Sequence, residues 1–492
     1  MKRSGIFTLI LLGSVLIIKG QTAVDALRYS KINIGGTARY IGMGGAFGAL
    51  GADFTTTSVN PAGLGLYKSS EFTITPSLYF GKTISTYNGM TAEDMRSNFN
   101  LGNAGIVFTS PVHSKPGQSG WKYVQFATGV NRLSNFNNRM DIQGPNNQNS
   151  LLDTYVESAN GINYSDIESD PYGDYAFDLN PAWWTYLLDT IPPFNNQYFS
   201  PIPDSSNIMQ AKSVSSWGSM NEWVFSFGAN YNDRLYIGAT FGLPWIRYYE
   251  TSTYTETDYT NSIYDFKQFN RYENLDTRGS GFNFKFGFIY RISDMFRIGG
   301  AFHTPTWYSN MRDLWYTTMS SYFDNGDYYI KSSPTGDYHY RLTTPLRATG
   351  SLGIIFGNVG LISIDYEFAN YGTARLDASD YSFGPENSDI KNSYRSTHQI
   401  RVGTEWRYDI FSFRGGFNYI TSPYQKNIND GTTMTYSLGV GMKEKWFFID
   451  LAYLYSKTKE DYYLYNTADI LTNPVNNDLR ASTVLMTLGA KF

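Results

Sequence analysis

The chain has 492 residues, a net charge of −4 and no cysteine. Without cysteine there can be no disulfide, thiol nucleophile or thiolate metal site, and the slightly acidic balance disfavours a nucleic-acid partner, which would need a basic face. The length suits several soluble domains or one large barrel, but after residue 20 no apolar run reaches the roughly 18 residues that a transmembrane helix needs.

The first twenty residues have the pattern of an export signal. Lys2 and Arg3 precede an apolar run over 6–18, which is long enough for a signal-peptide core and short for a bilayer span. We therefore expect a signal peptide at 1–20, with cleavage before Gln21 or a few residues later. No cysteine follows, so the chain is not expected to be a lipoprotein.

Residues 21–68 are rich in glycine and show no alternation of polar and apolar residues. They include a glycine-rich run from Gly42 to Asp53 and the triplet Asn60-Pro61-Ala62. Glycine and alanine at this density allow a compact, kinked backbone packed close to other elements. We expect this segment to fold as a plug inside a barrel formed by residues 69–492.

Alternation with a period of two recurs along residues 69–492. In the clearest case apolar side chains at 282, 284, 286, 288 and 290 alternate with smaller or polar ones, so that one face suits lipid and the other a lumen. Such segments begin near Glu71, Leu101, Trp121, Asn221, Arg234, Gly281, Met295, Leu346, Val359, Thr397, Phe411, Met434, Trp446 and Ala481. They predict an all-β, antiparallel transmembrane barrel of about 14 strands, since bacterial barrels have an even number.

The connections between these segments alternate between short and long. Short turns are expected at 232–233, 293–294, 358, 408–410 and 443–445, with one longer turn at 110–120. Long loops are expected at 83–100, 134–219, 253–279, 316–344, 370–395, 421–432 and 457–479. Membrane barrels have tight periplasmic turns and long extracellular loops, whereas a soluble β-sandwich would not need this order. The pattern places the N-terminal segment and Phe492 on the periplasmic side.

The largest loop, 134–219, contains two apolar clusters. Residues 151–156 hold one, and Trp183, Trp184, Leu187 and Leu188 form the other. Because Pro181 follows Asn180, we expect a short helix capped by Asn180. The adjacent tryptophans suit an apolar capture groove. The alternative is that the loop buries them in a small core of its own.

Alternation also places several charged side chains on the lumen face. They are Lys285, Arg297, Asp365, Glu367, Arg401, Glu405, Arg407 and Asp450. Lys285 and Arg297 lie on adjoining strands and are candidates for binding a ligand carboxylate; the alternative is that such charges pair with one another. His303 is the single candidate base, the four histidines show no metal-ligand spacing, and neither catalysis nor a cofactor or metal is expected.

The last strand, 483–492, alternates and ends on the aromatic Phe492. With the run from Gly42 to Asp53, the Asn60-Pro61-Ala62 triplet, the hairpin 279–305 and the strand opening at Pro345, it makes the sequence resemble the FadL/TodX family. These are outer-membrane transporters for long-chain fatty acids and other hydrophobic compounds. The resemblance spans nearly the whole chain.

The resemblance implies a barrel of fourteen strands plugged by an N-terminal hatch, with Asn60, Pro61 and Ala62 at the hatch. It also implies that the barrel assembly machinery recognises Phe492 and that a ligand leaves sideways beside a kinked third strand. That strand, 121–133, contains Gly129, which suits a kink or simply provides room in the wall.

Three functions are therefore considered. The leading one is passive uptake of a hydrophobic small molecule, resembling a long-chain fatty acid or an aromatic hydrocarbon, through a hatch-gated monomeric barrel surrounded by outer-membrane lipids. The alternative is a barrel whose extracellular loops dock or shuttle secreted proteins at the cell surface, as family relatives with a similar N-terminus imply. A nonspecific pore is disfavoured because a plug blocks open conductance.

Overall fold

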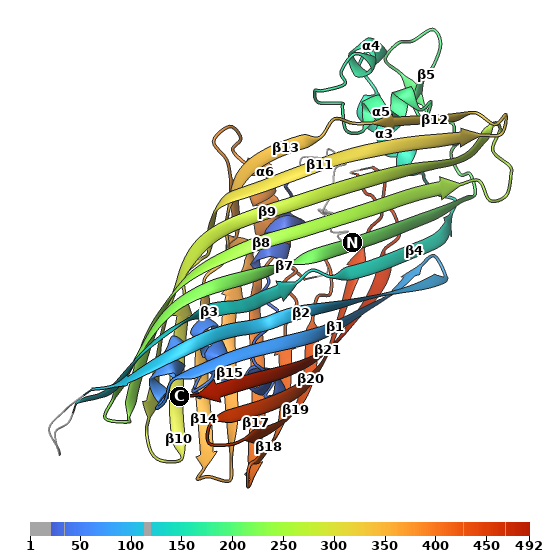
Figure 1. Cartoon of the computed structure of the whole chain (residues 1–492). Coiled ribbons are helices and arrows are strands. Elements are labelled where there is room, and N and C mark those ends of the chain that lie inside the picture. Colours follow the sequence, from blue (N-terminus) through green and yellow to red (C-terminus); the bar gives the residue numbers. More distant parts are fainter. Residues whose placement is uncertain (1–20, 34, 113–119, 427, 468) are drawn as a thin grey trace, which may run out of the picture.

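Fourteen antiparallel spanning strands form a closed barrel (Figure 1). The computed structural model describes residues 21–33, 35–112, 120–426, 428–467 and 469–492, so the expected signal at 1–20 lies outside the described residues. Closure is made by the last strand, which pairs with the first from Glu71↔Lys491 to Thr86↔Asn476. The predicted fold class and strand number are confirmed.

Several spanning strands consist of two or three consecutive elements because the ladder is briefly interrupted. In order around the barrel the strands are β1 (Glu71–Tyr87), β2 (Met90–Pro111), β3 with β4 (Trp121–Asn135 and Asn138–Asn146), β7 (Ile208–Tyr231), β8 (Leu235–Thr257), β9 (Phe266–Arg291), β10 with β11 (Phe296–His303 and Trp307–Phe323), β12 with β13 and β14 (Tyr328–Ser332, Gly336–Thr343 and Arg347–Phe356), β15 with β16 (Gly360–Asn370 and Arg375–Asp377), β17 (Ser396–Tyr408), β18 (Phe411–Ile420), β19 (Thr433–Lys443), β20 (Phe447–Tyr462) and β21 (Val475–Lys491).

The two ends of the barrel differ as the connection lengths predicted. Tight turns join the strands at one end, as at Asn232 and Asp233, whose φ of 54° is the left-handed value that a two-residue hairpin turn requires. At the other end the strands run further than expected: β1 and β2 meet at Asn88 and Gly89, so no long loop fills 83–100. The loops expected at 253–279 and 316–344 are likewise mostly strand, occupied by β8, β9, β11, β12 and β13. The prediction for 83–100 was wrong because polar residues such as the ion-paired Lys82 and Glu93 interrupt the run of apolar residues in the strand extensions, so the sequence pattern is hard to recognise.

The outward face of the barrel is apolar. Phe284, Phe286 and Phe288 on β9 are 39%, 51% and 45% exposed, whereas Lys285 between them is 4% exposed and points inward. The two faces assigned to this strand from its alternation are confirmed. A barrel with a lipid-compatible exterior and a polar interior follows.

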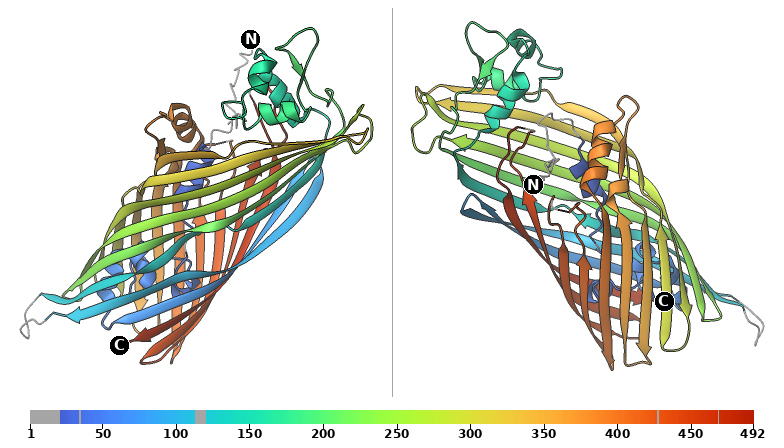
Figure 2. Two further views of the ribbon diagram at one scale, coloured as in Figure 1. Left: turned by 45° about the horizontal axis from the view of Figure 1, so that its top comes forward. Right: turned by 180° about the vertical axis from the view of Figure 1, so that it is seen from behind.

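The described part of the N-terminal segment, residues 21–33 and 35–66, lies inside the barrel (Figure 2). It consists of short helical pieces: α1 (Ala23–Ser30), α2 (Ala38–Gly42), η1 (Phe54–Ser58) and η2 (Pro61–Leu66). Each of the last three begins at a side chain that accepts a backbone N–H: Thr37, Asp53 and Asn60. Because capped turns satisfy their own backbone, the segment can fill the lumen without pairing as a strand.

Glycine allows this segment to approach the wall closely. Gly44 and Gly45 have φ of 62° and 77°, which other residues rarely adopt. A Cβ on Gly416 of β18 would lie 2.1 Å from the Gly44 nitrogen, so the two backbones touch where neither residue has a side chain.

The largest loop forms a small cap beyond the barrel end that is opposite the C-terminus (Figure 1). It contains α3 (Leu151–Ala159), α4 (Tyr164–Glu168), α5 (Leu179–Trp184), β5 (Asp189–Thr190) and β6 (Tyr198–Phe199); η3 (Tyr371–Thr373) and α6 (Gly384–Ser393) lie in another loop. The expected cap of α5 at Asn180 is wrong: Asp178 accepts the Leu179 N–H, and Asn180 instead donates to the Ile167 carbonyl. Among the described residues no helix is both long and apolar enough to cross a membrane.

Candidate functional site

Lumenal charges hold the N-terminal segment to the wall. The Asp365 carboxylate accepts the backbone N–H groups of Phe47 and Gly48, both at 2.9 Å. Arg39 Nε lies 2.9 Å from Glu405 Oε2, which belongs to β17. The segment is therefore bound by charge-assisted hydrogen bonds, which are stronger than neutral ones.

The lumenal charges also pair with one another, which is the alternative that the sequence left open for them. Glu367 pairs with Arg347 and Arg401. Arg414 bridges Glu405 and Asp450, at 2.7 and 2.5 Å. These carboxylates and guanidinium groups already have partners within the barrel and are not free to bind a ligand.

The Asn60-Pro61-Ala62 triplet ties two parts of the segment to the wall. Asn60 Nδ2 donates to the Gly48 carbonyl at 2.6 Å and to the Phe288 carbonyl of β9 at 3.1 Å. Its Oδ1 accepts the Ala62 N–H at 3.1 Å and starts η2, with Pro61 as the first helical residue. Because Asn60 is fully buried and makes these three bonds, we interpret the motif as an anchor of the N-terminal segment.

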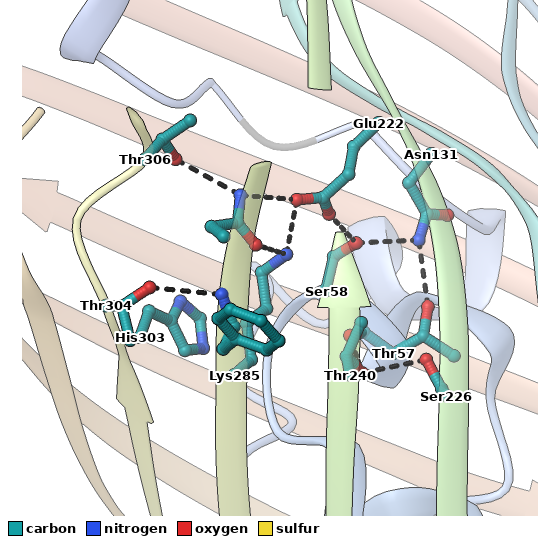
Figure 3. Close-up of polar contacts among 12 residues, drawn as sticks. Thr57, Ser58, Asn131, Glu222, Ser226, Thr240, Lys285, His303, Thr304 and Thr306 are labelled. Carbon is teal, nitrogen blue, oxygen red and sulfur yellow. Dashed lines mark hydrogen bonds and ion pairs between the residues drawn. The ribbon is translucent and has the colours of Figure 1, made fainter. Parts of the chain in front are cut away.

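A second anchor lies at the junction of η1 with β7 and β9 (Figure 3). Glu222 forms an ion pair with Lys285, accepts from Asn283 at 2.9 Å and accepts from Ser58 at 2.8 Å. Asn131 donates to Ser58 at 2.9 Å. Figure 3 shows Ser58 between Glu222 and Asn131, so the N-terminal segment closes a network of wall side chains.

Lys285 and Arg297 are not brought together. Lys285 lies opposite His303 in the ladder, whereas Arg297 lies opposite Arg291, six residues further along β9. The ammonium group of Lys285 is neutralised by Glu222. The carboxylate-binding role that was considered for this pair therefore stays an untested hypothesis with no shared site to support it.

His303 faces the N-terminal segment. Its Nε2 lies 2.8 Å from the Val59 carbonyl, and the side chain is 9% exposed. The described residues include no group of three or more histidine or acidic side chains placed to hold a metal.

Gly129 marks close packing of the third strand. Its ladder partners continue on both sides, with Gly105 on β2 and Val224 on β7. A Cβ at this position would lie 2.7 Å from the ring of Phe54 and 2.3 Å from the Ala104 carbonyl oxygen. Of the two interpretations of Gly129, the structure favours room for a neighbouring ring over a kink.

The pairing of β2 with β3 ends at Asn103↔Asn131, and beyond this point the two strands separate. The two strands pair from Asn103↔Asn131 to Pro111↔Tyr123, but among the described residues no ladder joins Met90–Gly102 to β3 or β4. Instead β4 crosses the inner face of the β1–β2 hairpin, as the 3.0 Å bond from Thr83 to Asn138 shows.

The N-terminal segment occupies the edge of β3 that β2 has left. The N–H of Asn33 donates to the Leu133 carbonyl at 2.9 Å, and the N–H of Gly35 donates to the Arg132 carbonyl at 3.2 Å. Arg132 Nε reaches across to the Leu101 carbonyl of β2 at 3.1 Å. These residues could not be identified from the sequence, because nothing local marks a strand edge that another segment will cover.

A cavity of about 390 Å³ adjoins this separation. The barrel wall from β17 round to β3 forms its outer side, and residues between Lys31 and Gly45 of the N-terminal segment form its inner side. Gly102 and Arg132, at the separation, are among its lining residues. The volume lies within the range of small-molecule sites.

The proposed capture residues are divided between a core and a surface. Leu187 and Leu188 are buried in the hydrophobic core of the cap, and Trp183 packs against that core with its ring stacked on Tyr164. Trp184 is 45% exposed, with the ammonium of Lys331 5.5 Å from its ring. Three of the four side chains thus belong to a hydrophobic core that the cap shares with the strand ends, which contribute residues such as Tyr254, Phe269 and Met319.

Comparison with known proteins finds likeness in fold. No protein-family model and no curated protein matches the sequence. A FadL homologue of Pseudomonas aeruginosa superposes over 94% of this chain and 100% of its own, with a TM-score of 0.57 at 12% identity. The Pseudomonas putida toluene transporter TodX covers 94% and 99%, with a TM-score of 0.54 at 11% identity.

The Ralstonia pickettii toluene transporter TbuX also covers 94% of this chain and 99% of its own, with a TM-score of 0.52 at 15% identity. The chain therefore has the fold of the FadL/TodX-like transporters, as its motifs implied.

Proposed function

We propose that the chain is an integral, monomeric barrel of a bacterial outer membrane that lets hydrophobic small molecules, resembling long-chain fatty acids or aromatic hydrocarbons, diffuse inward. The observation that carries this proposal is the lumen itself: residues 21–33 and 35–66 occupy it and leave a cavity against the wall where β2 parts from β3. A nonspecific pore would need an open lumen.

In this proposal residues 21–68 act as the hatch, and both the short turns and Phe492 face the periplasm, where the barrel assembly machinery recognises the terminal aromatic. A molecule collected at the long-loop end enters the cavity and leaves sideways between β2 and β3. The bonds from Asn33 and Gly35 to the edge of β3 close that exit. Each such backbone bond stabilises the closed state by about 0.5–1.5 kcal/mol.

The exit can be tested by removing one backbone donor. Asn33→Pro deletes the N–H that bonds Leu133, whereas Asn33→Ala keeps it and serves as the matched control. We expect cells producing Asn33→Pro to take up radiolabelled toluene and dodecanoate about 2- to 10-fold faster than wild type, and Asn33→Ala to behave as wild type.

Two other outcomes would count against the proposal. Equal uptake by the proline and alanine variants would mean that the edge of β3 is not part of the transport path. If uptake by cells with the wild-type barrel is no faster than by cells without it, the barrel does not transport these molecules.

Docking of secreted proteins is the second candidate, and the cap favours it. Ile191 and Phe194 follow β5 in the cap, are 41% and 49% exposed, and are not among the residues that line the cavity. If the cap is a docking surface, the double variant Ile191→Asp and Phe194→Asp will lose co-purifying secreted proteins while probe uptake is unchanged. If the two variants reduce uptake instead, the cap serves the transport path.

A further inference from the structure

Hydroxyl and amide side chains are the largest group among the residues that line the cavity, beside an apolar surface that exceeds the polar one, and their number is unexpected for a hydrocarbon site. On the wall from β17 to β20 they form cross-strand pairs: Thr433 with Thr458 at 2.8 Å, Thr435 with Ser456 at 3.1 Å and Gln399 with Asn418 at 3.0 Å. Each group keeps further hydrogen-bonding capacity, because a hydroxyl can donate once and accept twice.

An apolar surface faces the cavity at the level of α2. Ile41, Leu454 and Leu485 line the cavity and belong to the cluster that packs around that helix. The cavity therefore offers both hydrogen bonds, from pairs such as Thr435 with Ser456, and apolar contact, from Ile41, Leu454 and Leu485. A ligand matching both must itself have a hydroxylated face and an apolar face.

Four basic side chains also line the cavity: Lys31, Lys82, Arg132 and Arg480. Among the described residues Lys31 and Arg132 form no ion pair within 4.0 Å, whereas Lys82 and Arg480 pair with Glu93 and Asp478. The cavity also includes one lining carboxylate, Glu460. Arg132 and Lys31 can therefore take an acidic group of a ligand without breaking an existing pair.

We propose that this cavity binds an amphiphile that carries several hydroxyl groups along one face and an acidic group at one end, in preference to a plain hydrocarbon or an unbranched fatty acid. This inference rests on the proposed function, since it names the substrate class of the same path. A buried site built of hydrogen-bonding groups discriminates against ligands that leave those groups unpaired.

The test compares probes that share some of these features. Cholate has three hydroxyls and a carboxylate on an apolar frame, decanoate has the carboxylate alone, and toluene has neither. With the full barrel in lipid nanodiscs, calorimetric titration below the micellar concentration should give a Kd for cholate about 10-fold or more below that for decanoate, with toluene weakest.

Variants of cavity residues distinguish the contribution of the hydroxyl groups to binding from that of the positive charge. Thr435→Val removes a hydroxyl and keeps the shape, so it should weaken cholate about 3- to 10-fold and leave decanoate unchanged. Arg132→Gln should weaken both anions. Thr318→Val is the matched control, because Thr318 pairs with Ser332 at 2.8 Å in the same way but outside the cavity.

The outcomes are distinct. Selective loss of cholate binding in Thr435→Val, with the control unchanged, supports the inference. Decanoate or toluene binding as tightly as cholate, or insensitivity of cholate to Thr435→Val, overturns it and leaves the proposed function standing. If none of the three probes binds, the proposed function fails with it.

Discussion

Replacing Glu222 by glutamine leaves the ammonium group of Lys285 without a countercharge inside the barrel. The two side chains are 0% and 5% exposed, so water does not compensate. Breaking a buried pair on one side costs about 3–5 kcal/mol. Because a glutamine carbonyl still accepts from Asn283 and Lys285, we expect the lower end of this range, about 3 kcal/mol of unfolding free energy.

The double variant Glu222→Gln with Lys285→Met removes both charges and keeps both shapes. Neutral side chains that pack well in place of a buried ion pair are often close to neutral in stability. We expect the double variant to lie within about 1 kcal/mol of wild type, which makes the coupling between the two sites about 2 kcal/mol or more.

Urea titration of the barrel in lipid vesicles, followed by tryptophan fluorescence, measures these free energies. Heat-modified mobility on gels reports whether each variant is folded at the start. The reasoning is refuted if Glu222→Gln costs less than about 1 kcal/mol, or if the double variant is no more stable than that single variant.

Two further predictions concern the anchor and the cap. Asn60→Ala removes the bond to the Phe288 carbonyl of the wall, the bond to the Gly48 carbonyl within the segment, and the η2 cap. Hydrogen exchange of the segment's protected amides should therefore quicken about 10-fold, and an unchanged rate would contradict the anchor. Burial raises the pKa of Asp178, in the cap, to about 6. Since the folded cap then holds a proton that the unfolded chain has lost, its stability falls as the pH rises from about 4 to 6. Proteolysis of the cap should be faster at pH 7 than at pH 4.5 in wild type; the same pH dependence in Asp178→Asn would contradict this.

Strand positions and barrel type were predictable because they depend on local pattern. Alternation along β9 identifies its two faces wherever the outward residues are apolar, and tight turns such as Asn232-Asp233 need only their own residues. The ends of β1 and β2 were not predictable, since polar residues such as Lys82 and Glu93 interrupt the apolar residues there and obscure the sequence pattern.

The candidate site was less accessible because it depends on contacts between distant strands. Lys285 was correctly placed on the lumen face, but its partner Glu222 lies on a different strand and only the register brings them together. The cavity likewise depends on where residues 31–45 lie, and no local pattern in the sequence gives that position. The helix cap was misplaced because Asp178 and Asn180 are both good caps, and tertiary contact with Ile167 selected between them.

The location of the N-terminal segment has a consequence for the order of folding. The Ala38 N–H donates to Thr487, 449 residues away, and the Gly44 N–H donates to Ser437, 393 residues away. The first part of the chain therefore completes its contacts only after the last strands exist. Because contacts of such long sequence separation slow folding, closure of β21 on β1 and docking of the segment belong to one late step. A chain truncated before β21 would neither close the barrel nor dock the N-terminal segment.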